Sequence, residues 1–168
     1  MITRRQFLMT SGALFLAGCA GRARVLPSTP GSLDSTVRLH VPRSKHFRIL
    51  QLTDLHFFSN REFQANSGRV MTRDIIDAVI RKTKPDLLLI TGDTWPANRE
   101  PRTGEMQMRR AIPILEGFGL PWAYTWGNHD QLANMDEGHQ ALAEAKNSLY
   151  RGTKTNGNYV IDLVGKHN

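Results

Sequence analysis

Three short polar clusters in this 168-residue chain carry side chains that can bind metals or transfer protons. They are Asp54-Leu55-His56, Gly92-Asp93 and Gly127-Asn128-His129-Asp130. Carboxylate, imidazole and amide groups are ligands for divalent metals of intermediate hardness, such as Mn, Fe or Zn. Taken singly, each cluster is also typical of a surface turn, because Gly, Asn and Asp are the common turn residues. Their shared position in the fold must decide between a turn and a reaction site.

The segments between the clusters predict strands that alternate with helices. The predicted strands are 37–41, 47–52, 86–90, 120–126 and 158–164, and the predicted helices are 74–84, 108–115 and 141–149. Strands alternating with helices of this length indicate βαβ units and a mostly parallel sheet. The fold class is therefore α/β, and each polar cluster directly follows one of the predicted strands.

The three clusters are expected to meet at one edge of this sheet. Carboxyl ends of neighbouring parallel strands share an edge, and ligands of open α/β sheets bind there. Asp54 and His56 are two residues apart, so an extended backbone would point both side chains the same way. Gly92 permits a tight turn that presents Asp93, and Asn128 can bind a metal without adding charge. Three clusters in this order are hard to explain as turns alone.

Together the motifs resemble those of the calcineurin-like metallophosphoesterases, and most of all the bacterial branch akin to purple acid phosphatases. The resemblance extends over about residues 48–164 and implies a β-sandwich flanked by helices, with two divalent or mixed-valence metal ions. By this resemblance Asp54 and His56 would bind the first metal, Asp93 would bridge both metals, and Asn128 would bind the second.

The same resemblance implies the reaction. Two cations hold the phosphoryl oxygens and lower the pKa of a bridging water, which gives a hydroxide for in-line attack. His129 would protonate the leaving oxygen, and Asp130 would orient His129. The implied activity is hydrolysis of phosphomonoesters or phosphodiesters, with a phosphorylated small molecule as the substrate.

The sequence also departs from the family pattern. Family members supply three further histidines from a Gly-His pair and a Gly-His-x-His motif. This chain contains no Gly-His-x-His, and its one Gly-His pair, at 138–139, does not directly follow a predicted strand. We therefore expect an N-terminal half of the enzyme, in which the second half of the fold is missing. The alternative is a non-catalytic or decayed exported lipoprotein that retains a partial metal site.

The N-terminus resembles an export signal. Arg4 and Arg5 precede a short apolar stretch, as in a twin-arginine signal, and residues 16–19 (LAGC) resemble a lipobox that ends at Cys19. We expect a signal peptide at 1–18, a flexible tether at 19–36 and the phosphoesterase part at 37–168. Cys19 would be lipidated and would hold the protein on a membrane, periplasmic or outer-surface, after export across the bacterial inner membrane. The other interpretation is an apolar helix with a chance arginine pair and a buried cysteine.

Composition excludes some functions. The net charge is +7 and the sequence pI is about 10.1, a balance that could suit anionic partners. The basic residues are scattered, with no block of five or six and no interleaved aromatic residues. We therefore expect no nucleic-acid partner. The single cysteine excludes a disulfide within the chain.

Overall fold

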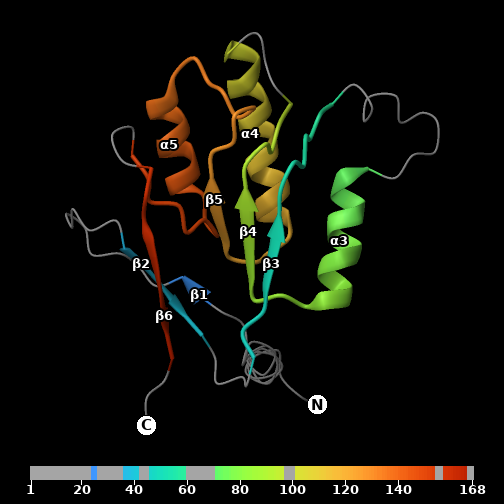
Figure 1. Ribbon diagram of the computed structural model, residues 1–168, viewed down its shortest axis with the longest axis vertical. Coiled ribbons are helices and arrows are strands. Elements are labelled where there is room, and N and C mark those ends of the chain that lie inside the picture. Colours follow the sequence, from blue (N-terminus) through green and yellow to red (C-terminus); the bar gives the residue numbers. More distant parts are fainter. Residues whose placement is uncertain are drawn as a thin grey trace, which may run out of the picture.

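The computed structural model describes residues 24–25, 36–41, 46–59, 71–96, 101–153 and 157–165 (Figure 1). The elements in chain order are β1 (Arg24–Val25), β2 (Thr36–His40), β3 (Ile49–Leu52), α3 (Thr72–Thr83), β4 (Leu87–Thr91), α4 (Pro101–Gly117), β5 (Trp122–Thr125), α5 (Met135–Glu144) and β6 (Val160–Val164). The expected signal peptide and Cys19 lie outside the described residues. Within the described part, no helix has both the length and the apolar character needed to cross a membrane.

The central sheet has the strand order β3-β4-β5, and both pairings are parallel. Figure 1 shows the three arrows side by side and pointing the same way, with α3 and α4 as the connections between them. This confirms the predicted α/β class with a parallel sheet. Leu88 and Ile90 of the middle strand are fully buried, because the other two strands and the helices enclose it.

A second sheet has the order β1-β2-β6, in which β6 is parallel and β1 antiparallel to β2. Val37 and Leu39 of β2 are completely buried, as the alternating pattern of this strand predicts. The Tyr159 hydroxyl just before β6 joins the two sheets. It accepts a hydrogen bond from the Tyr124 amide and donates one to the Tyr124 carbonyl, each at 2.9 Å.

The third helix differs from its predicted position. It spans Met135–Glu144 instead of 141–149, because the Asn134 side chain caps it by accepting from the amides of Asp136 and Glu137. Leu149 lies beyond the helix and is fully buried between the two sheets. The α4 helix is longer than the predicted segment 108–115, and it continues through Pro113 to Gly117.

Candidate metal centre

The three polar clusters occupy the loops that follow β3, β4 and β5, at the carboxyl edge of the central sheet. Asp54, His56 and Asp93 each offer one ligand atom, and these atoms all lie within 4.8 Å of one another. The His56 Nε2 atom is 3.8 Å from a carboxylate oxygen of Asp54. The structure therefore brings the first two clusters together, as the parallel sheet requires.

The backbone at this site is unusual. Asp54, His56 and Asp93 all adopt left-handed conformations, with φ of 54°, 43° and 54°. Residues other than glycine rarely adopt positive φ, and such strain concentrates at functional sites. The extended backbone expected for Asp54 and His56 is therefore wrong. Their side chains share one side because a left-handed turn places them there.

Hydrogen bonds between the first two loops hold this conformation. The Asp54 amide donates to the Gly92 carbonyl at 3.2 Å, and the His56 amide donates to the Asp93 carbonyl at 3.0 Å. Phe57 continues the pairing through its amide to the Thr94 carbonyl at 2.8 Å. The loops thus extend the contact between β3 and β4 beyond the strands, and this contact offsets the strain of the left-handed residues.

Two glycines allow the second and third loops to touch. A Cβ atom on Gly92 would lie 2.7 Å from the Gly127 Cα atom. A Cβ atom on Gly127 would lie 2.2 Å from a carboxylate oxygen of Asp93. No side chain larger than a hydrogen fits at either position without movement of the backbone or of Asp93. Gly127 therefore allows the third loop to lie in close contact with Asp93.

His129 lies directly beside the three clustered ligands. Its backbone amide donates to a carboxylate oxygen of Asp93 at 2.9 Å. Its ring centroid is 5.0 Å from that of His56, edge to face. Among the described residues, its Nδ1 atom is buried and has no hydrogen-bond partner. None of the described residues therefore supplies a partner for this ring nitrogen.

Asp130 has different contacts from those expected. Its side chain is buried, and its carboxylate accepts from the amides of Thr94 (2.8 Å), Trp95 (3.3 Å) and Gly127 (2.9 Å). The expected hydrogen bond to the His129 ring does not occur among the described residues. The reason is that both carboxylate oxygens already serve these amides. Asp130 therefore ties the loop after β4 to the loop after β5.

Asn128, the fourth expected metal ligand, is exposed at the tip of the third loop. Its backbone carbonyl accepts a hydrogen bond from the Gln131 side chain at 3.1 Å. It also lines a pocket of about 420 Å³ that opens beside the site. Its position one residue before His129 keeps it near the clustered ligands through the chain itself.

Comparison with known proteins identifies the family. Residues 47–166 match the calcineurin-like phosphoesterase family. The chain belongs to this family. The chain is 29% identical over 106 residues to "Phosphatase DCR2" of Saccharomyces cerevisiae, a match that covers 58% of this chain and 18% of that protein. Distant homologues in the purple acid phosphatase family agree with the resemblance seen in the sequence.

One such homologue is "Probable inactive purple acid phosphatase 28" of Arabidopsis thaliana, 30% identical over 54% of this chain and 25% of that protein. The "DNA double-strand break repair protein Mre11" of Aeropyrum pernix is 32% identical over 49% of this chain and 21% of that protein. The matched segments span about a fifth to a quarter of these three relatives.

The three clustered residues of this chain fit a divalent metal. Two carboxylates and one imidazole suit Mn, Fe or Zn, and none of the three side chains is fully buried, so an ion from solution can reach them. The left-handed backbone holds these donors in position before any ion binds. Membership of this family, together with this Asp-His-Asp cluster, supports metal binding by the chain.

A network behind the third loop was not predicted from the sequence. The Trp126 indole donates to the Tyr150 hydroxyl at 2.7 Å, and this hydroxyl lies 2.6 Å from Nδ1 of His139. An indole can only donate, so the Tyr150 hydroxyl oxygen accepts from Trp126, and the direction of its contact with His139 is set by the tautomer of the imidazole. Burial lowers the pKa of His139 and so favours the neutral ring. His139 follows Gly138 inside α5, and nothing in the sequence signalled this role.

Proposed function

We propose that the protein is a dinuclear-metal phosphoesterase that hydrolyses phosphomonoesters or phosphodiesters of small molecules. One observation carries the proposal. Asp54, His56 and Asp93 converge from two loops in left-handed backbone, and the His129 amide binds the same Asp93 carboxylate. Such a set of donors next to an imidazole suits metal-assisted hydrolysis.

Each residue has a defined task in this proposal. Asp54 and His56 would hold the first metal ion, Asp93 would serve as a ligand of both ions, and Asn128 would contribute to the second. When bound, divalent metal ions neutralise charge on the phosphoryl oxygens and supply a nucleophile from water at neutral pH. The His129 ring delivers a proton to the leaving oxygen. Its place is fixed by the bond between its amide and Asp93.

Asp130 acts one step further from the reaction. By binding the amides of Thr94, Trp95 and Gly127, its carboxylate fixes the distance between the loops that carry Asp93 and His129. We therefore assign Asp130 as a positioning residue. Three charge-assisted hydrogen bonds in a buried setting are strong enough for that purpose.

The test is hydrolysis of p-nitrophenyl phosphate with added Mn²⁺, by the protein expressed from its complete open reading frame. Hydrolysis should depend on Mn²⁺, stop on chelation and fall by about 10²–10⁴-fold in His129→Asn, as expected for loss of a general acid. His40→Asn, in the second sheet, is the matched control and should keep full activity. Stoichiometric Mn²⁺ binding without any hydrolysis would contradict the proposal.

That last outcome would support the alternative of a non-catalytic lipoprotein with a partial metal site. Two observations favour this alternative. The sequence has no Gly-His-x-His motif and its one Gly-His pair lies inside α5, and three relatives carry names such as "Probable inactive purple acid phosphatase". A downstream reading frame that encodes both motifs would favour the enzyme, which the same p-nitrophenyl phosphate assay then tests.

We further propose that the protein is exported and anchored by a lipid on Cys19. The support is the order of the arginine pair, the apolar stretch and the lipobox in residues 1–19. Labelling with a radioactive fatty acid should mark the wild-type protein and not Cys19→Ser, which should appear as a soluble form. Equal labelling of both proteins, or of neither, would contradict lipidation at this residue.

A further inference from the structure

A second feature of the carboxyl edge is the pocket of about 420 Å³ beside the third loop. Its lining residues are Trp126, Gly127, Asn128, Asp130, Gln131, Leu132 and Met135. One of them, Asn128, is also a metal ligand in the function proposed above, so the pocket adjoins the candidate metal centre at this residue. A phosphoester bound at the metal centre would have this pocket as its neighbour.

The chemistry of the lining selects what can enter. Trp126, Leu132 and Met135 are apolar, whereas Asn128 and Gln131 are polar but uncharged. Among the described residues of the lining, Asp130 is the only charged one, and its oxygens accept from backbone amides. None of the described lining residues is a lysine or arginine. A second phosphate or a carboxylate would therefore find no cation among these residues, and its charge would be left unpaired.

We propose that this pocket binds the apolar or aromatic alcohol portion of the phosphoester, and so sets the preferred substrate class. This inference rests on the function proposed above. It favours an aryl or otherwise apolar phosphate ester over a polyphosphorylated compound such as a nucleoside diphosphate. Clefts that bind small molecules are commonly apolar, with a few polar groups that fix orientation, as here.

Most of the pocket wall is held in place before a ligand arrives. Trp126 is fixed by its hydrogen bond to Tyr150, and Gln131 is fixed by its bond to the Asn128 carbonyl. Leu132 packs so closely that a Cβ atom on Gly138 would lie 2.3 Å from it. A preformed wall lowers the entropic cost of binding. Met135 is the half-buried first residue of α5, and it is the wall position most open to substitution.

The test compares two non-hydrolysable phosphonates on the Mn²⁺-loaded protein by isothermal titration calorimetry. Phenylphosphonate and methylphosphonate present the same anion and differ only in the apolar group. We expect phenylphosphonate to bind about tenfold more tightly. Met135→Trp, which fills the pocket, should remove this preference and leave methylphosphonate binding unchanged. Met135→Ala should reduce the preference by about threefold. This variant replaces Met135→Trp in the test if the larger residue disturbs folding.

The control is Met106→Trp, because Met106 is an exposed methionine of α4 outside the pocket lining. It should keep the tenfold preference. Equal affinities for the two phosphonates, or a preference that both Met135 variants retain, would overturn the pocket assignment. The proposed hydrolysis would then stand, because the phosphonate anion still binds. If neither phosphonate binds the Mn²⁺-loaded protein, the proposed function fails, and the pocket assignment fails with it.

Discussion

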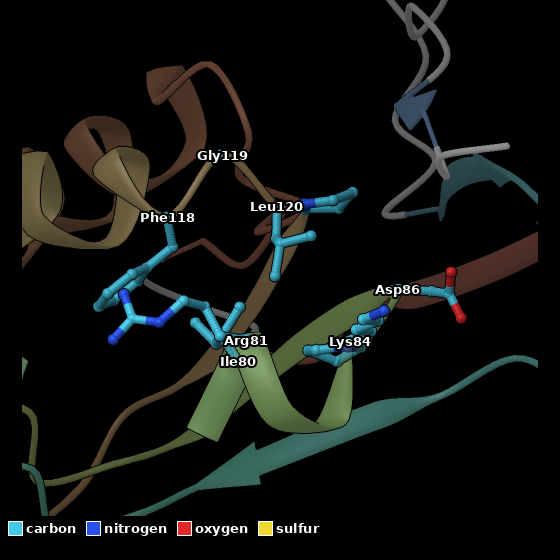
Figure 2. A pocket seen from close by; sticks show the side chains of 9 residues that line it. Ile80, Arg81, Lys84, Asp86, Phe118, Gly119 and Leu120 are labelled. Atoms are coloured by element: carbon cyan, nitrogen blue, oxygen red, sulfur yellow. The ribbon is translucent and has the colours of Figure 1, made fainter. Parts of the chain in front are cut away.

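The two edges of the central sheet offer a direct comparison, because each has a pocket and each has residues with left-handed backbone. The pocket at the amino edge is the larger, at about 480 Å³. Figure 2 shows that its lining comes from the end of α3 and from the turn before β5. Two of its charged groups already have partners: Arg81 pairs with Asp77, and Asp86 accepts from the Arg48 amide at 2.9 Å.

The left-handed residues at the two edges also differ in what their conformation achieves. At the amino edge, Lys84 has a φ of 50° because it terminates α3, and its amide closes the helix on the Ile80 carbonyl. This is a common way for a helix to end. At the carboxyl edge, Asp54, His56 and Asp93 end no helix, and their conformation brings metal ligands together. A functional site is thus better indicated by strain without a local structural reason than by the size of a hollow.

The largest expected effect is a loss of Mn²⁺ affinity, and it is tested by replacing one aspartate at each edge of the sheet. Asp93→Asn removes a carboxylate shared by the candidate metals and the His129 amide, so Mn²⁺ affinity should fall by at least about 100-fold. Asp86→Asn is the matched control at the opposite edge and should leave Mn²⁺ affinity unchanged. Calorimetric titration with Mn²⁺ measures both. Similar losses of Mn²⁺ affinity in the two variants would contradict the assignment of the metal site to the carboxyl edge.

A pair of glycine substitutions sharpens the comparison. In Gly127→Ala the new methyl group would lie 2.2 Å from the Asp93 carboxylate, which should lower the free energy of unfolding by about 1–3 kcal/mol. Mn²⁺ affinity should fall by about tenfold as Asp93 moves. Gly119→Ala also strains a residue with positive φ, at a cost of about 1–2 kcal/mol, but its Cβ atom meets open space. Unchanged Mn²⁺ affinity in both variants would contradict the assigned role of Gly127.

Much of this site could be predicted from the sequence, because the residue pattern of each segment indicates its secondary structure. The apolar run 87–90 and the alternation of strands and helices indicate a parallel sheet, and a parallel sheet places the ends of its strands at one edge. Asp54, His56 and Asp93 therefore had to converge. The left-handed backbone at these residues could not be predicted, since hydrogen bonds from a loop almost 40 residues further along the chain impose it.

The hydrogen-bond partners of Asp130 could not be predicted for the same reason. Its carboxylate binds amides of Thr94 and Trp95, which are 36 and 35 residues away in the sequence. A motif of four adjacent residues suggests a partner within the motif, and so Asp130 was assigned to His129. The proposed lipid anchor at Cys19 lies outside the described residues and stays a prediction.

The next effect concerns stability and involves Asp130. Asp130→Asn keeps the shape of the side chain but turns one acceptor oxygen into a donor that faces a backbone amide. The buried amides then lose a partner, and the free energy of unfolding should fall by about 1–3 kcal/mol. Chemical denaturation measures this change. Asp162→Asn, which affects only an exposed ion pair with Arg38, should change it by less than about 0.5 kcal/mol. Equal stability of the two variants would show that the hydrogen bonds of Asp130 are not needed to hold the two loops together.

The smallest effect is at the amino edge, where strain should be dispensable. Lys84→Gly relieves the left-handed residue that ends α3, and glycine is the residue preferred at this position of a helix. The variant should be more stable by about 0.5–1 kcal/mol in thermal or chemical denaturation, since the relief of strain exceeds the entropic cost of glycine. Its Mn²⁺ affinity should equal that of the wild type. If relief of strain at Lys84 weakened Mn²⁺ binding, the amino edge would be coupled to the metal centre, and its backbone strain would require a functional explanation as well.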